Sequence, residues 1–136
     1  MINFLIVTHG EFGAYMVEAA ESIVGRQEGV RVVAISSRQS IPEVRERVGR
    51  ALAALGGGDG VILFTDMPGG TPGNVSFTLI KDLSGVEMIS GVNLYMLVSA
   101  FSHRSGCALS ELVLKVLSDG QKSIKDIRQM FLAKVR

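Results

Sequence analysis

His9 and Asp66 are the two residues of this 136-residue chain whose positions favour chemistry. Each directly follows a short apolar run of the kind that forms a buried strand, at residues 2–8 and 61–65. If the two strands are parallel neighbours, their carboxyl ends meet at one edge of a sheet. A carboxylate that accepts a hydrogen bond from one ring nitrogen fixes the tautomer and leaves the lone pair of the other nitrogen free. The pair therefore predicts a nucleophilic histidine.

The loop that follows the second of these runs, DMPGGTPGN at residues 66–74, suits an anion. Gly69 and Gly70 permit a sharp turn and a close approach of the backbone. Thr71 followed by Pro72 is typical of a helix N-cap with proline at the first helical position. That helix would point its free N–H groups into the same space, where such groups bind phosphate. Together with the histidine and the carboxylate, this loop predicts a site that accepts a phosphoryl group on histidine.

Strand-like and helix-like segments alternate along the chain. Apolar residues repeat with helical spacing in several segments, and short β-rich runs lie between these, at residues 30–36, 61–65 and 86–90. This alternation predicts an α/β fold: an open, mostly parallel sheet with helices on both faces. With the strand order 2-1-3-4, the order reverses between the first and third strands, where ligands bind in such sheets. The tail from residue 122 onward fits neither a helix nor a strand clearly.

The composition indicates a globular chain that fits one domain, residues 1–136. It is 47% hydrophobic and 20% charged, and its net charge of +1 argues against nucleic acid or an anionic membrane as the main partner. The single cysteine, Cys107, and the lack of a signal sequence predict a reducing, cytoplasmic setting. No stretch approaches the about 20 apolar residues of a membrane span, so we expect any contact with a membrane to be indirect.

Three motifs, VTHGEFG, TDMPGGTPGN and SGVNLYML, together resemble the enzyme IIA component of the mannose family in the bacterial sugar phosphotransferase system. The resemblance implies that His9 accepts a phosphoryl group on Nε2 from the phosphocarrier HPr and passes it to a IIB component. Asp66 would hold the ring, and Thr71 would donate to the phosphoryl oxygens. The membrane components IIC and IID would be reached only indirectly. The set expected to bind the phosphoryl group is Gly10, Gly69, Gly70 and Thr71.

The same resemblance implies a homodimer. Members of the family exchange an antiparallel edge strand from the C-terminal end of the chain, and we place that strand at residues 123–127. This interpretation would account for the ambiguous pattern of the tail.

Two other functions remain as alternatives. A regulatory protein of the same fold would also accept phosphate at His9, but would act by binding another protein. A flavodoxin-like nucleotide or flavin binder is disfavoured, because THGEFG lacks the G-x-G-x-x-G pattern and no G-x-x-x-x-G-K-[ST] occurs. We expect no cofactor and no metal, since the two histidines and Cys107 have no ligand spacing. His103, Cys107 and Glu11 are interpreted as structural or solvated residues.

Overall fold

The computed structural model describes residues 1–135, and within them the strands form a four-stranded parallel sheet. The strands are β1 (Asn3–His9), β2 (Val30–Ile35), β3 (Val61–Thr65) and β4 (Val86–Ser90). Their order in the sheet is β2-β1-β3-β4, which confirms the predicted order and fold class. The strand order therefore reverses between β1 and β3, the two strands that precede the candidate histidine and aspartate.

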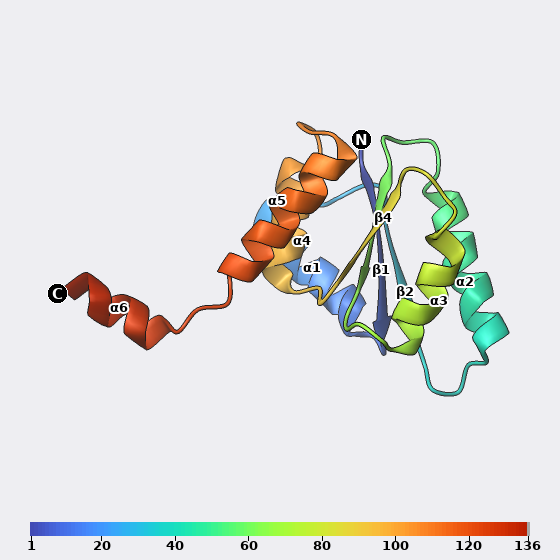
Figure 1. Cartoon of the computed structure of the whole chain (residues 1–136), viewed down its shortest axis with the longest axis horizontal. Coiled ribbons are helices and arrows are strands. Elements are labelled where there is room, and N and C mark those ends of the chain that lie inside the picture. The colour runs from blue at the N-terminus through green and yellow to red at the C-terminus, as the bar shows by residue number, and fades with distance from the viewer. Residues whose placement is uncertain (136) are drawn as a thin grey trace.

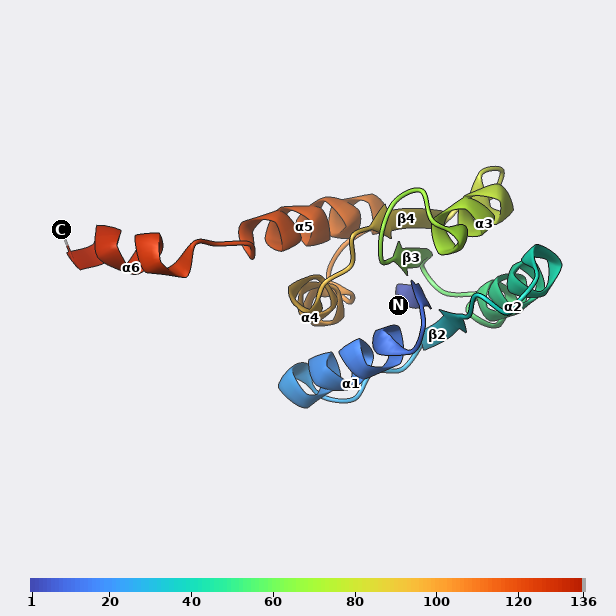
Figure 2. The same cartoon turned by 90° about the horizontal axis from the view of Figure 1, so that it is seen from below.

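Helices cover both faces of this sheet (Figures 1 and 2). One face packs against α1 (Phe12–Val24), α4 (Leu94–His103) and α5 (Leu109–Lys122). The opposite face packs against α2 (Ile41–Ala54) and α3 (Thr71–Ile80). Each strand is followed by a helix, so α1, α2, α3 and α4 all begin at the carboxyl edge of the sheet.

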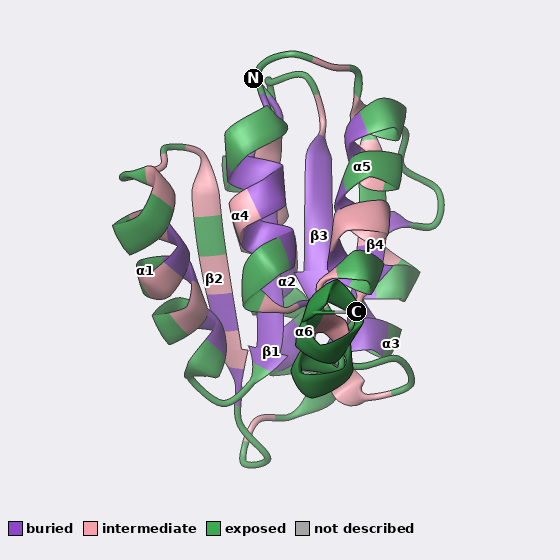
Figure 3. Ribbon diagram, turned by 90° about the vertical axis from the view of Figure 1, so that its left-hand side faces the viewer, coloured by how far each residue is buried: buried purple, intermediate pink, exposed green. Residues whose placement is uncertain are grey.

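The alternating side chains of β1 account for the two apolar layers. Phe4 and Ile6 belong to the cluster beneath α1, α4 and α5, whereas Leu5 and Val7 belong to the cluster beneath α2 and α3. All four side chains are fully buried, and Figure 3 shows β1 and β3 as the buried centre of the sheet. A strand that is covered on both faces needs an apolar residue at nearly every position. This requirement explains why these strands stand out in the sequence as continuous apolar runs.

A buried arginine holds the amino edge of the sheet together. Arg104, only 5% exposed, donates from Nε and Nη2 to the Ile2 carbonyl and from Nη1 to the Glu28 carbonyl, at 3.0, 2.6 and 2.7 Å. Its guanidinium carbon lies 4.8 Å from the centre of the Phe4 ring. Burial lowers the pKa of Arg104, and the Glu28 carboxylate opposes that effect. The side chain thus links the end of α4 to the start of β1 and to the loop before β2.

The C-terminal tail forms a helix in the single chain. Residues 124–126 have no regular structure and α6 (Ile127–Val135) is a helix, so the strand expected at residues 123–127 does not form without a second chain. Its exchange in a dimer stays a prediction. Asp126 accepts a hydrogen bond from the Gln129 N–H at 3.0 Å, which caps the helix. An edge strand needs the backbone of a neighbouring strand, and without one the local cap decides the structure. The helix α6 extends away from the sheet with no buried residue (Figures 1 and 2).

Among the described helices, there is none whose length and apolar content would let it cross a bilayer.

Candidate functional site

His9 and Asp66 meet at the carboxyl edge of the sheet, between β1 and β3, as the sequence predicts. The Nδ1 of His9 lies 2.7 Å from Oδ2 of Asp66, and the backbone N–H of His9 donates to the same oxygen at 2.9 Å. The other carboxylate oxygen accepts from the Met67 N–H at 2.9 Å. The side chain of Asp66 is 10% exposed, whereas that of His9 is 47% exposed. The carboxylate is therefore fixed in place while the imidazole faces solvent.

The hydrogen bonds around Asp66 determine its charge. Partial burial raises the pKa of this carboxyl, but the hydrogen bonds from His9 and Met67 and the charge of His9 together outweigh burial and leave the pKa below its ordinary value. Asp66 is thus ionised at neutral pH and can only accept hydrogen bonds. Its contact with Nδ1 therefore requires the proton on Nδ1, and in the neutral ring Nε2 keeps its lone pair.

A glycine turn and a close helix contact fix the end of β1. Gly10 has a φ of +65° and donates its N–H to the Ile35 carbonyl at 2.8 Å. Gly13 lets α1 approach the strand, because an added Cβ would lie 2.7 Å from Oγ1 of Thr8. The Thr8 hydroxyl, which is buried, donates to the Gly10 carbonyl at 3.2 Å. Thr8 and Gly13 therefore support the turn that carries His9.

Sequence reasoning did not identify Thr8 or Gly13 as part of the site. The available signal was Gly13 itself, a glycine inside a segment with helical periodicity. Such a glycine lowers helix stability and usually has a packing reason.

The loop after β3 begins α3 one residue earlier than predicted. Gly70 is the N-cap, with Thr71 and Pro72 as the first two helical residues, so the prediction of Thr71 as the N-cap is wrong. Asn74 explains the difference, because its N–H donates to the Gly70 carbonyl at 2.9 Å and its side-chain amide donates to the Gly69 carbonyl at 3.3 Å. These two bonds close the first turn around the glycine pair, and the Thr71 hydroxyl is not used as a cap.

The amino end of α3 lies beside the imidazole. An added Cβ at Gly70 would lie only 3.2 Å from Nε2 of His9. Within residues 1–135, the backbone N–H groups of Thr71 and Gly73 have no hydrogen-bond partner, as expected in the first turn of a helix. Such groups bind anions, and the helix dipole adds to the attraction. The structure thus brings the glycine pair next to the ring, while contact of these residues with a phosphoryl group stays a prediction.

The other residues with reactive side chains lie outside this arrangement. The Nδ1 of His103 is 2.8 Å from the Ser99 carbonyl, and the Cys107 thiol donates to the His103 carbonyl at 3.4 Å. Glu11 precedes α1 and is exposed, and its side chain makes no capping bond. In the part of the chain that the structure describes, no group of three or more His, Cys, Asp or Glu side chains could hold a metal ion.

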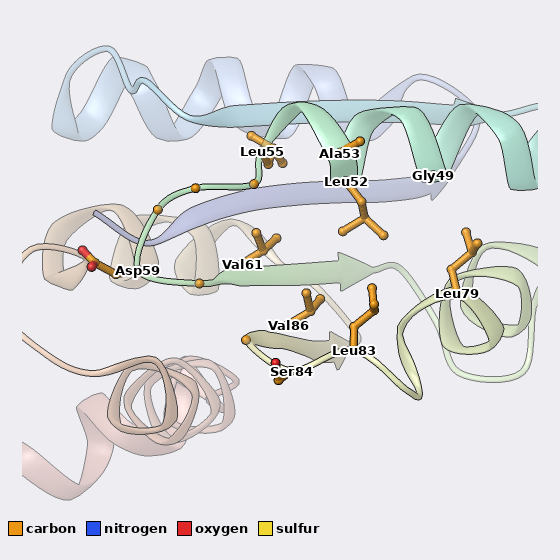
Figure 4. Close-up of a pocket in the computed structure, with 15 residues that line it drawn as sticks. Gly49, Leu52, Ala53, Leu55, Asp59, Val61, Leu79, Leu83, Ser84 and Val86 are labelled. Atoms are coloured by element: carbon orange, nitrogen blue, oxygen red, sulfur yellow. The ribbon is translucent and has the colours of Figure 1, made fainter.

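A separate cavity of about 610 Å³ opens at the amino ends of β3 and β4, between the C-terminal ends of α2 and α3 (Figure 4). The described residues that line it include none of the predicted site residues. Its wall is mainly apolar and is formed by Leu52, Leu55, Val61, Leu79, Leu83 and Val86, together with the glycines of residues 56–60. A wall of this composition does not suit a phosphoryl group, so the cavity does not compete with the His9 edge as the site of the predicted chemistry.

Comparisons with known proteins find relatives of this chain. The family model EIIA-man, described as the PTS system fructose IIA component, matches residues 3–117. The chain is 29% identical over 128 residues to the PTS system mannose-specific EIIAB component of Escherichia coli (strain K12), and the match covers 93% of the chain but 40% of that relative. It is 28% identical over 125 residues to the PTS system fructose-specific EIIA component of Bacillus subtilis (strain 168), covering 92% of the chain and 86% of that relative.

A solved structure of a related protein has the same fold. The crystal structure of the phosphotransferase system component EIIA from Streptococcus agalactiae superposes with a TM-score of 0.86 at 31% sequence identity. The match covers 95% of this chain and 99% of that one. The chain thus spans less than half of the E. coli relative, but nearly the whole of the S. agalactiae protein.

Proposed function

Because the chain belongs to the mannose family of phosphotransferase-system IIA components, which are phosphocarriers in sugar transport, we propose that it carries a phosphoryl group on His9. The observation that supports this proposal is the 2.7 Å contact between Nδ1 of His9 and the Asp66 carboxylate. It leaves Nε2 as the nucleophile of a ring that solvent, and therefore another protein, can reach.

In the proposed step, the lone pair of Nε2 attacks the phosphorus of a phosphorylated donor. A bond forms between Nε2 and phosphorus while the bond from phosphorus to the donor atom breaks, and the electron pair of that bond stays with the donor. The proton on Nδ1 remains in place, and Asp66 stabilises the positive charge that develops on the ring. Transfer to the acceptor is the same exchange in the opposite direction, so Nε2 regains its lone pair.

The loop and the turn around the ring would hold the phosphoryl oxygens. The Thr71 hydroxyl and the free N–H groups at the amino end of α3 would donate to these oxygens. Gly10, Gly69 and Gly70 would let the backbone come close to them. Phosphoryl transfer depends mainly on positioning and on stabilisation of charge, so this small set of groups is sufficient.

The partners in this proposal are an HPr-like protein as donor and a IIB component as acceptor, with IIC and IID reached only through IIB. We place the single IIA domain in the cytoplasm, as a homodimer. The outer edge of β4, which is unpaired within the described chain, and the uncovered helix α6 support association with a second copy. Neither the matched family nor the two curated relatives favour the regulatory alternative.

The test is incubation of the chain with phosphorylated HPr, followed by intact mass spectrometry. The wild-type protein is expected to gain one phosphoryl group, and His9→Ala is expected to gain none. His103→Ala is the matched control, because His103 is the second of the two histidines in the chain and its ring is bound to a backbone carbonyl. Phosphorylation of His9→Ala at the wild-type rate would end the proposal.

A second stage of the same experiment tests the acceptor. Addition of a IIB component to the phosphorylated chain is expected to remove the group from this chain and place it on IIB. If the group stays where it is, while His9→Ala still fails to accept one, the acceptor is wrong and the histidine is right.

A further inference from the structure

The two glycines of the loop after β3 are glycine for different reasons. Gly69 has a φ of +81°, a conformation that favours glycine, and an added Cβ there would meet no atom within 4 Å. Gly70 has a φ of −85° and a ψ of 174°, an extended conformation that any residue adopts. An added Cβ at Gly70 would lie 2.8 Å from Cε1 and 3.2 Å from Nε2 of His9. The lack of a side chain at Gly70 is therefore required by the imidazole and not by the backbone.

A second contact is needed to fix the orientation of the His9 ring. Its Nδ1 is held by Asp66 at 2.7 Å, but the ring is 47% exposed, and one hydrogen bond does not fix its tilt. Cε1 and Nε2 of the ring lie beside Gly70, on the side where a Cβ would stand. This contact places the reacting nitrogen next to the first turn of α3, where the free N–H groups lie.

We propose that Gly70 is a positioning residue for phosphoryl transfer: its missing side chain lets the His9 ring lie against the amino end of α3 while Asp66 holds Nδ1. The inference rests on the proposed phosphocarrier function of His9. A methyl group at position 70 pushes the ring outward, because the ring is exposed and moves more easily than the backbone. The chain still folds, since the backbone conformation at this position suits any residue. Displacement of a reacting atom by about 1 Å can lower a rate by about 100-fold.

The experiment compares Gly70→Ala with the wild type in two measurements. The rate of phosphoryl acceptance from phosphorylated HPr is expected to fall by about 10- to 100-fold, with a melting temperature close to that of the wild type. The ¹⁵N NMR spectrum of ring-labelled histidine is expected to show a lower population of the Nδ1–H tautomer at His9. A purely structural role of Gly70 would change the melting temperature and leave the ring spectrum as it is.

Three further variants complete the design. Gly70→Ser adds the same Cβ but supplies a favoured N-cap side chain, so it separates the position of the ring from the capping of α3. Gly69→Ala strains the backbone at a φ of +81° and places no atom near the ring, so it is expected to lower the melting temperature and leave the His9 ring spectrum unchanged. Gly57→Ala, at a φ of +92° in the loop at the other end of β3, is expected to leave both the rate and the ring spectrum unchanged.

The inference is overturned if Gly70→Ala and Gly70→Ser accept phosphate at the wild-type rate. It is also overturned if they lose rate while the ring spectrum of His9 does not change. Failure of the proposed function gives a different result, in which the wild-type protein accepts no phosphoryl group. In that event the ring spectra still decide whether Gly70 positions the imidazole.

Discussion

The two edges of the sheet are built alike, but their charged groups have different surroundings. Each edge has a glycine-rich loop next to β3 and a charged side chain that is largely buried, Arg104 at the amino edge and Asp66 at the carboxyl edge. Arg104 donates mainly to backbone carbonyls, those of Ile2 and Glu28. Asp66 instead binds a half-exposed imidazole. A buried charge beside a glycine loop therefore indicates chemistry only when it faces a reactive group that solvent can reach.

The glycines at the two edges lead to the same conclusion. In the amino-edge loop, an added Cβ at Gly58 would lie 2.6 Å from the Met1 carbonyl, and one at Gly60 would lie 2.8 Å from Cδ2 of Leu109. These glycines make room for the backbone and the core. At the carboxyl edge, Gly70 makes room for the His9 ring. A structural glycine and a glycine at a reactive site thus differ in which atoms occupy the space beside them.

The largest expected effect is a loss in the rate of phosphoryl acceptance, caused by a substitution at the carboxyl edge. Asp66→Asn is expected to lower the rate of phosphoryl acceptance by about 10²- to 10⁴-fold, because an amide can donate to Nδ1 and so stabilise the wrong tautomer. The measurement is the rate of mass gain with phosphorylated HPr.

Asp59→Asn is the matched control for this change. Asp59 belongs to the amino-edge loop and pairs with the N-terminal ammonium at an exposed position. Its replacement is expected to leave the rate unchanged. Equal losses in the two variants would mean that the carboxylate at position 66 has no special role in transfer.

At the amino edge the expected loss is one of stability. Arg104→Met is expected to lower the free energy of unfolding by about 2–4 kcal/mol, because the Ile2 and Glu28 carbonyls lose their donors inside the protein. Urea denaturation measures this change. The folded fraction is expected to accept phosphate at the wild-type rate.

Arg50→Met is the comparison, since Arg50 forms an exposed ion pair with Glu46 on α2. It is expected to change the stability by no more than about 0.5 kcal/mol. If both arginine variants are equally stable, Arg104 does not hold the amino edge together.

Gly60→Ala is expected to have a smaller effect, a loss of about 1–3 kcal/mol. The position has a φ of +118°, and the added Cβ would meet both Leu109 and the Gly85 carbonyl, at 2.8 and 3.2 Å. Gly49→Ala on α2 meets no atom within 4 Å and is expected to be neutral or slightly stabilising. Thermal unfolding of the two variants checks the prediction, and an unchanged melting temperature for Gly60→Ala would contradict it.

The sequence was sufficient for the parts of the molecule that follow from chain connectivity and apolar patterning. Parallel strands joined by helices place their carboxyl ends at one edge, so the meeting of His9 and Asp66 followed from the strand order alone. The contacts of Arg104 could not be predicted, because they join residues about 100 positions apart without any local pattern. The start of α3 was misplaced by one residue because the Asn74 N–H donates to the Gly70 carbonyl, which makes Gly70 the cap.

The tail marks another limit of sequence reasoning. Its apolar residues, among them Ile124 and Phe131, are exposed in the described chain. They are therefore not spaced to form one buried face of a helix or a strand. The local cap at Asp126 selects a helix in the chain on its own. A second chain could supply contacts that no pattern in one chain contains.

The smallest expected effect is the pH dependence of stability at the carboxyl edge. The pKa of Asp66 in the folded chain is below its ordinary value of 3.8, so the unfolded chain binds a proton more readily at this residue. The ionised carboxylate therefore contributes stability above pH 3.8, and this contribution is lost as the pH falls through the lower folded pKa. The effect is small because burial opposes the hydrogen bonds that lower this pKa.

Urea denaturation of the wild type and of Asp66→Asn between pH 6 and pH 3 measures this contribution. The difference in their free energies of unfolding is expected to shrink as the pH falls below about 4, since the protonated acid resembles the amide. The difference between the wild type and Gly60→Ala is expected to stay constant over the same range, because that change touches no titratable group. If the difference in free energy of unfolding for Asp66→Asn stays constant or grows on acidification, the contacts from His9 and Met67 do not favour the charged form of Asp66. The contrast between the two edges would then lose its electrostatic basis.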